Sequence, residues 1–336
     1  MKNVRIIGGS SNPKLVADVS KRLKKKPIGN VFEYFANTEF RPRIPESVRG
    51  KDIFILQTGG YTSKDEGDFR TANDYLMETY ILAKTLRRSD AKTVNLIVPF
   101  FPYSREDKKD NPRGAISARD VADIFELARV DRVITFDLHA PQIQGFFNVP
   151  CDNLYTTYAI KDYLDKNVFK KVKNYKEKFV LIAPDEGAMK RIKEFAILFE
   201  LPFLVLSKER DYSKKNTVNK TVLIGDKKYL KGRTAIIIDD MIDTFGTVNK
   251  ATSVIKRKGA KDLIVCAGHG ILSGPAIDLI NKNDFIKMVL VSDSIPQAMH
   301  QKMCKKLKVF TIAPMIADIV KRLVKGRSIS QMFARR

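Results

Sequence analysis

The stretch AIIIDDMIDTFGTVN, residues 235–249, is the most informative part of the chain for its fold. Four aliphatic residues run directly into two carboxylates, Asp239 and Asp240. A third carboxylate, Asp243, precedes a turn rich in hydroxyl groups. Such an aliphatic run is typical of a strand buried on both faces of a parallel sheet. Because neighbouring carboxylates repel one another, packing alone gives no reason for the cluster. The pattern therefore predicts a ligand site.

The same pattern, an aliphatic run that ends in glycine or polar residues, recurs along the chain. The other runs are 4–11, 52–60, 94–105, 132–140, 179–187, 263–270 and 288–296. The helix-like segments between them are 71–89, 117–130, 187–200 and 246–260, the last with Thr244 as the expected N-cap. Strands that alternate with helices predict an α/β fold with two similar, doubly wound parallel sheets. Ligands of such sheets bind beyond the carboxyl ends of the strands.

Composition limits the class of protein. The chain has 336 residues, enough for two domains, and 44% of them are hydrophobic, as in a globular protein. No apolar run approaches the ~20 residues that cross a bilayer, and the N-terminus has no signal-peptide core. Cys151, Cys266 and Cys304 lie far apart without metal-ligand spacing. We therefore expect a cytoplasmic protein without a membrane partner.

A formal net charge of +23 indicates an anionic partner. However, the lysines are spread along the chain, and the densest runs, 21–26 and 170–178, lack the interleaved aromatic residues of a single-strand binding platform. Nucleic-acid binding is therefore not favoured, although the reason for the charge stays open.

Five long motifs, in order along nearly the whole chain, resemble those of ribose-phosphate diphosphokinase (PRPP synthetase), most closely the phosphate-activated class I. The motifs are FFPYSREDKKD (100–110), DLHAPQIQGFFNVPCDNLY (137–155), APDEGAMKR (183–191), DDMIDTFGT (239–247) and HGILSGPAI (269–277). The resemblance implies two domains of phosphoribosyltransferase type. We expect the first at 1–154, with 318–336 packing back on it, and the second at 155–317.

The resemblance implies a transferase of nucleotide biosynthesis that moves the diphosphoryl group of Mg-ATP to the C1 hydroxyl of ribose 5-phosphate. The products would be PRPP and AMP. Ionised Asp239 and Asp240 would accept hydrogen bonds from the two ribose hydroxyls. The turn would bind the 5-phosphate at a helix N-terminus. The residues of this turn are Asp243, Thr244, Phe245, Gly246 and Thr247.

Further roles follow from the resemblance alone. His139 and Asp185 would hold Mg²⁺, and His139 would also belong to the catalytic and ATP-binding groups. Lys208 and Arg210 would be catalytic cations on a polar stretch, 206–221, that we expect to be a loop closing over the phosphates. ATP would contact Arg105, Glu106 and Asp110, and a neighbouring subunit would contribute Phe35, Asn37 and Glu39 to the adenine site.

Several features depart from the family pattern. Glu106 replaces the usual glutamine, which leaves the preference for the nucleotide donor open. Phe245 replaces a small residue, and its effect on phosphate affinity depends on where the ring points. The segment 59–72 is longer than in typical members, without a functional account.

The resemblance also implies regulation. Ser47, Arg49, Arg113, Ser328 and Ser330 match positions that bind an oxyanion between subunits, where inorganic phosphate activates and ADP inhibits. We expect a homohexamer built from dimers.

Three other functions remain possible at this point. The chain could be a catalytically silent subunit associated with the synthetase, although all the implied catalytic residues are present. A phosphoribosyltransferase that consumes PRPP would share the acidic turn but leave the motif at 100–110 unexplained. Nucleic-acid binding is the third.

Overall fold

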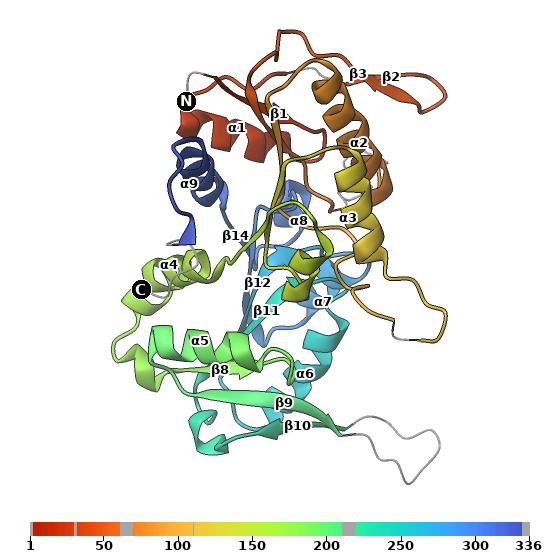
Figure 1. Cartoon of the computed structure of the whole chain (residues 1–336). Helices are drawn as coiled ribbons and strands as arrows, with labels where there is room; N and C mark the ends of the chain where they lie inside the picture. The colour runs from red at the N-terminus through yellow and green to blue at the C-terminus, as the bar shows by residue number, and fades with distance from the viewer. Residues whose placement is uncertain (1–2, 30–31, 61–69, 110, 210–219, 331–336) are drawn as a thin grey trace. The chain divides into compact units, whose positions relative to one another are not determined.

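The computed structural model describes residues 3–29, 32–60, 70–109, 111–209 and 220–330 (Figure 1). The chain divides into two compact units. The first comprises residues 1–156, 293–296 and 311–336, and the second comprises 157–292 and 297–310. Each unit contains one main β-sheet with its own hydrophobic core. Within the described ranges, no helix is both long and apolar enough to cross a membrane.

The first unit holds a five-stranded parallel sheet in the order β1-β4-β5-β6-β7. Its strands are β1 (Val4–Gly8), β4 (Asp52–Leu56), β5 (Thr93–Val98), β6 (Arg132–Phe136) and β7 (Cys151–Leu154). Its helices are α1 (Pro13–Leu23), α2 (Ala72–Arg88), α3 (Ser117–Leu127) and α9 (Ala313–Val324). A separate two-stranded hairpin joins β2 (Phe32–Tyr34) to β3 (Phe40–Pro42).

The winding of this sheet reverses between β1 and β4. After α1 the chain forms a parallel bridge from Ile28 to Ile7 on the outer side of β1, whereas β4 pairs with the other side. Right-handed crossovers in opposite directions place their helices on opposite faces. Accordingly, α2 and α3 cover the face that contains Ile53 and Leu96, while α1 and α9 lie side by side on the other face (Figure 1).

The second unit holds a seven-stranded sheet in the order β10-β9-β8-β11-β12-β13-β14. Its strands are β8 (Phe179–Ala183), β9 (Phe203–Glu209), β10 (Lys220–Ile224), β11 (Thr234–Ile242), β12 (Asp262–Gly270), β13 (Ile286–Ser292) and β14 (Leu307–Phe310). Its helices are α4 (Thr157–Asn167), α5 (Met189–Phe199), α6 (Gly246–Arg257), α7 (Ala276–Lys282) and α8 (Ala298–Met303). The chain winds from β8 through α5 to β9, then restarts at β11 on the other side of β8.

The predicted doubly wound α/β fold is therefore confirmed, with one correction. The polar stretch 206–221 was expected to be a loop, but β9 continues to Glu209 and β10 begins at Lys220, and the two strands pair antiparallel. A long-range pairing supplies the backbone hydrogen bonds here, so local polarity does not prevent strand formation. Residues 210–219 lie outside the described part of the chain.

Candidate active site

The carboxylates Asp239 and Asp240 lie on β11 beyond the end of its neighbour β8. The pairing of β11 with β8 stops at Ile237, opposite Ile182, whereas pairing with β12 continues to Ile242. The last residues of β11 therefore project past the point where the winding of the sheet reverses. This is the position at which a doubly wound sheet opens a ligand crevice.

A cation that the sequence analysis did not assign completes this acidic pair. A terminal guanidinium nitrogen of Arg191, on α5, lies 3.3 Å from Oδ1 of Asp239 and 3.2 Å from Oδ1 of Asp240. Both Lys190 and Arg191 fall in the first turn of α5, where basic side chains oppose the helix dipole. A basic residue at this unfavourable position is a signal, available in the sequence, that its side chain pairs with a negatively charged group.

Burial and the neighbouring Asp240 raise the pKa of Asp239 well above its ordinary value, while the Arg191 guanidinium acts in the opposite direction. Asp239 Oδ1 also accepts a hydrogen bond from the backbone N–H of Asp240, at 2.9 Å. The site thus holds two closely spaced carboxylates and one cation. Such a group contributes little to the stability of the fold, but its oxygens can accept hydrogen bonds from a polyhydroxyl ligand.

The turn after β11 leads into the N-terminus of α6. Phe245, not Thr244 as predicted, is the residue that caps this helix, and it makes no side-chain capping hydrogen bond. Phe245 takes a left-handed conformation, with φ 65°. Its side chain is 2% exposed and belongs to the core cluster that contains Val248 and Ile255. The ring therefore points into the core, while Thr244 and Thr247 are exposed beside the helix N-terminus.

Two other predicted residues lie on loops that follow strands of the second unit. Asp243 accepts a hydrogen bond from Ser273 Oγ, which ties the turn to the segment after β12. Asp185 follows β8, is exposed, and accepts the backbone N–H of Ala188 through Oδ1 at 3.0 Å. Lys208 lies on β9, paired with Thr221, and Arg210 lies outside the described residues.

In the first unit, His139 is exposed just after β6. Its neighbour Asp137 is buried with φ 39° and accepts hydrogen bonds from the hydroxyl of Thr156, at 2.5 Å, and from its backbone N–H. The backbone N–H of Leu138 also bonds to Asn153 Oδ1 at 3.1 Å. Asp137 therefore shapes the turn that presents the imidazole of His139.

The described residues implied in nucleotide binding are solvent-exposed in this unit. Arg105 and Glu106 lie on the loop after β5, and Asp110 is outside the described residues. Phe35, Asn37 and Glu39 form the turn of the β2–β3 hairpin, with Phe35 47% exposed. An exposed aromatic ring beside an exposed amide and carboxylate offers a stacking face and hydrogen bonds for a base.

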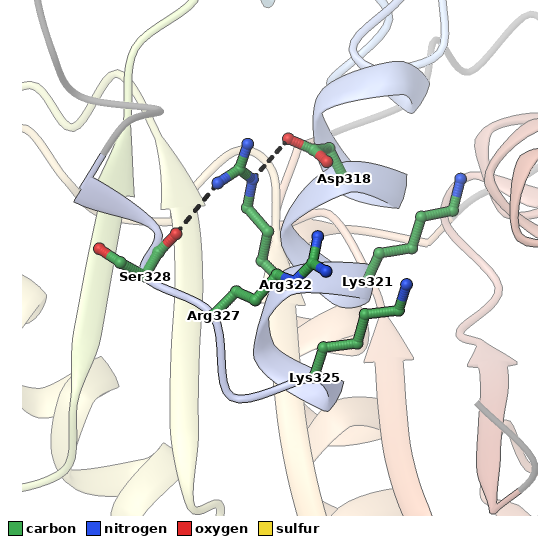
Figure 2. Close-up of a pocket in the computed structure, with 6 residues that line it drawn as sticks. All are labelled: Asp318, Lys321, Arg322, Lys325, Arg327 and Ser328. Carbon is green, nitrogen blue, oxygen red and sulfur yellow. Dashed lines mark hydrogen bonds and ion pairs between the residues drawn. The ribbon is translucent and has the colours of Figure 1, made fainter.

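A cavity of about 470 Å³ opens at the C-terminal end of α9 (Figure 2). The described residues that line it are Asp318, Lys321, Arg322, Lys325, Arg327 and Ser328. Arg322 turns toward Asp318, with Nε 2.8 Å from Oδ2, and donates to the carbonyl of Ser328 at 3.1 Å, whereas Lys321 and Lys325 extend away from that pair (Figure 2).

The other residues of the expected regulatory site do not line this cavity. Ser330 donates its backbone N–H to Ser328 Oγ at 3.1 Å. Ser47, Arg49 and Arg113 are exposed elsewhere in the first unit, where Arg49 pairs with Asp90 at 3.1 Å.

Comparisons with known proteins agree with this geometry. A family model described as the N-terminal domain of ribose phosphate pyrophosphokinase matches residues 4–128, and one described as the phosphoribosyl synthetase-associated domain matches residues 212–334. The chain is 38% identical over 333 residues to ribose-phosphate pyrophosphokinase 2 of Schizosaccharomyces pombe, covering 99% of this chain and 98% of the relative. The chain belongs to the ribose-phosphate pyrophosphokinase family.

Two further members of the family cover almost the same length. The ribose-phosphate pyrophosphokinase of Helicobacter hepaticus is also 38% identical, covering 99% of this chain and 100% of the relative. The crystal structure of phosphoribosylpyrophosphate synthetase from Mycobacterium smegmatis has a TM-score of 0.84 and 34% identity, covering 96% and 99% of the two chains. These relatives are named for the catalytic activity, which supports an enzyme over a silent associated subunit.

Proposed function

We propose that this chain transfers the diphosphoryl group of Mg-ATP to the C1 hydroxyl of ribose 5-phosphate, giving PRPP and AMP for nucleotide biosynthesis in the cytoplasm. The observation that carries the proposal is the cluster of Asp239, Asp240 and Arg191 at the winding reversal of a family member. The three cysteines are free thiols, as a reducing compartment requires.

The sugar phosphate would bind along β11 and the start of α6. Asp239 and Asp240 would each accept a hydrogen bond from a ribose hydroxyl, and a carboxylate acceptor makes such bonds short and strong. The 5-phosphate would lie against the first amides of α6, with the hydroxyls of Thr244 and Thr247 beside it. The buried ring of Phe245 leaves that space to the phosphate, so the departure at this position need not weaken binding.

The donor nucleotide would contact Arg105, Glu106, Asp110 and His139, while the hairpin of a second copy supplies Phe35, Asn37 and Glu39. Stacking on Phe35 accommodates any base, whereas Asn37 and Glu39 would read the edge of adenine. The exposure of the hairpin turn supports this arrangement, because its own unit leaves these side chains accessible.

Mg²⁺ fits the donor set that the chain offers. Among the described residues, no three His, Cys, Asp or Glu side chains gather into a metal-binding group. Mg²⁺ needs no such cage, because it is commonly held by one or two protein ligands together with water and phosphate oxygens. His139 and Asp185, both exposed, would be those ligands, and the ion would neutralise the negative charge of the phosphates.

The chain's own residues would lower the barrier mainly by positioning and charge. The carboxylates orient the C1 hydroxyl toward the β-phosphorus. Lys208 and Arg210, which carry positive charge, would stabilise the charge that develops on the transferred group. Attack by the C1 hydroxyl oxygen would form a new bond to the β-phosphorus and break the bond between that phosphorus and the α,β-bridging oxygen. The bridging oxygen would leave with AMP, and the hydroxyl proton would pass to solvent.

We also propose regulation at the C-terminal end of the chain. The cavity beside Ser328 is lined by four cationic side chains and one carboxylate, a charge balance that suits phosphate or the phosphates of ADP. Ser47, Arg49, Arg113 and Ser330 would join this anion site when copies assemble, which is consistent with a hexamer of dimers.

The deciding experiment incubates the purified chain with ribose 5-phosphate and Mg-ATP and measures AMP and PRPP together. We expect both to form in equal amounts. The doubly substituted Asp239→Asn, Asp240→Asn variant should need a much higher concentration of ribose 5-phosphate but a similar concentration of ATP. Absence of both products in the unmodified chain would favour the silent-subunit alternative.

A further inference from the structure

A buried carboxylate outside the proposed active site lies at the winding reversal of the first sheet. Glu78, on α2, is 1% exposed. Its Oε1 accepts the hydroxyl of Ser10 at 2.7 Å, and its Oε2 accepts the side-chain amide of Gln57 at 2.6 Å. Ser10 follows β1 and Gln57 follows β4, so Glu78 joins the ends of these two neighbouring strands. Nothing in the diphosphoryl transfer uses this group.

Two further residues reach the same carboxylate, one from the β2–β3 hairpin and one from just before α2. The phenol of Tyr34, the last residue of β2, donates to Oε1 of Glu78. Arg70 lies 3.4 Å from that oxygen and donates to the Tyr34 hydroxyl at 2.7 Å. Tyr34 is 48% exposed, and partial burial together with the bond to Glu78 raises its pKa to about 12, so the phenol stays protonated and remains a donor.

Arg70 is held in place on both sides. Its guanidinium lies over the ring of Tyr34, at 5.3 Å from the centroid, and over that of Tyr75, at 5.9 Å. The next residue, Thr71, opens α2 with a capping box that includes Asp74. Arg70 therefore joins the longer segment 59–72 to the carboxylate of Glu78 and the phenol of Tyr34.

The turn that follows Tyr34 is organised by its own contacts. The backbone N–H of Phe35 donates to the carbonyl of Glu39 at 2.7 Å, and the amide of Asn37 donates to the Glu39 carboxylate at 2.9 Å. Arg41 lies 5.4 Å over the Phe35 ring. A turn held together internally moves as one piece, so its direction depends on what anchors the hairpin.

The hairpin is too small to hold its own direction. Each of its strands has three residues, and an isolated two-stranded hairpin is marginally stable in water. Phe32 packs against the core of the first unit. Tyr34 adds the polar anchor, one residue before Phe35, through a bond to a buried acceptor that cannot be replaced by water without cost.

We propose that Glu78, Tyr34 and Arg70 form a brace that sets the direction of the Phe35–Glu39 turn and so positions the adenine-binding residues offered to the neighbouring subunit. The proposal rests on the function proposed above. These three are positioning residues, because they act through the turn. The brace also gives the segment 59–72 a role, since its end supplies Arg70.

The first test is a kinetic comparison of the full-length Tyr34→Phe variant with the unmodified chain. This change removes only the hydroxyl. Because bonds to a carboxylate are among the stronger hydrogen bonds, we expect KM for ATP to rise about tenfold. KM for ribose 5-phosphate and kcat at saturating ATP should change less than about twofold, since the turn acts in nucleotide binding.

Tyr175→Phe is the matched control. It deletes the same atom from a phenol in the second unit that donates to the carbonyl of Phe199 at 3.2 Å. Both KM values should stay unchanged in this variant. Glu78→Gln and Arg70→Ala should reproduce the ATP effect. If Glu78→Gln fails to fold, Tyr34→Phe still decides the matter.

A second measurement does not depend on catalysis. The chain contains no tryptophan, so Phe35→Trp introduces a single fluorophore on the turn. Adding Tyr34→Phe to that variant should lower the fluorescence anisotropy of the indole, and adding Tyr175→Phe should not. Unchanged anisotropy together with an unchanged KM for ATP would overturn the brace. If the unmodified chain makes no PRPP, the proposed function fails, and the anisotropy alone decides whether the brace holds the turn.

Discussion

The guanidinium of Arg191 lies within 3.3 Å of one oxygen of Asp239 and 3.2 Å of one oxygen of Asp240. This contact brings the first turn of α5 to the carboxyl end of β11. It places a fixed positive charge beside two carboxylates that would otherwise repel one another. The pair's ionisation therefore depends on a residue from another element.

Arg191→Gln should shift the pH profile of kcat/KM for ribose 5-phosphate. The cation lowers the pKa of Asp239, so its loss should raise that pKa further. Activity that needs the ionised carboxylate should then be lost at a higher pH as the solution is acidified. Arg191→Lys keeps the charge and should retain most of the original profile. An acid limb at the same pH in Arg191→Gln would contradict the contact's electrostatic role.

Asp239→Asn should stabilise the folded chain at neutral pH. The folded-state pKa of Asp239 is raised above its ordinary value of 3.8, so the folded state binds the proton more tightly, and stability falls as pH rises through that window. Removing the charge should raise Tm by about 3 °C at pH 7.

The gain should disappear near pH 4, where the native carboxyl is already protonated in the folded state. Thermal unfolding of both chains at several pH values measures it. A gain that does not depend on pH would exclude ionisation as its cause.

At Phe245 we expect a glycine variant to be more stable than an alanine variant, the reverse of the usual order. Phe245→Ala leaves a cavity in the core, which costs about 3–5 kcal/mol. Phe245→Gly leaves a similar cavity but relieves the left-handed backbone, which is worth about 1 kcal/mol. The glycine variant should therefore be the more stable of the two, as measured by the midpoint of urea unfolding. Equal or reversed midpoints would show that the left-handed conformation costs nothing here.

Lys208→Ala or Arg210→Ala should lower kcat by about 100-fold while KM for ATP stays nearly constant. Both cations would act on charge that develops during transfer, so their loss appears in turnover. Lys227→Ala, an exposed cation of the same unit, serves as the control. Equal loss of ATP affinity and turnover would assign Lys208 or Arg210 to ground-state binding.

The cavity at the end of α9 should mediate activation by phosphate. Lys325→Gln combined with Arg327→Gln removes two of its four cations and should weaken activation by about tenfold or more in phosphate concentration. Basal activity without phosphate should change little. Lys170→Gln with Lys171→Gln removes the same charge from an exposed turn and should have no effect. Normal activation of the cavity variant would move the anion site elsewhere.

The nature of each element could be predicted from local sequence. The aliphatic runs that became β8 and β11 are too apolar for any position except the middle of a covered sheet, and the helix at 246–257 begins within a residue of its expected start. The polar stretch around Lys208 was the exception, because β9 obtains its hydrogen bonds from a strand eleven or more residues away in sequence.

The sequence by itself determined which residues carry chemistry: two carboxylates at the end of a buried strand have no packing purpose, and their neighbours follow a family's motifs. Only the tertiary structure decided how those groups are held. Arg191 meets Asp239 because α5 and β11 flank the same strand, and Tyr34 meets Glu78 across 44 residues. The left-handed backbone at Phe245 turns its ring into the core. Such distances and directions depend on packing between elements remote in sequence, and local propensity does not encode them.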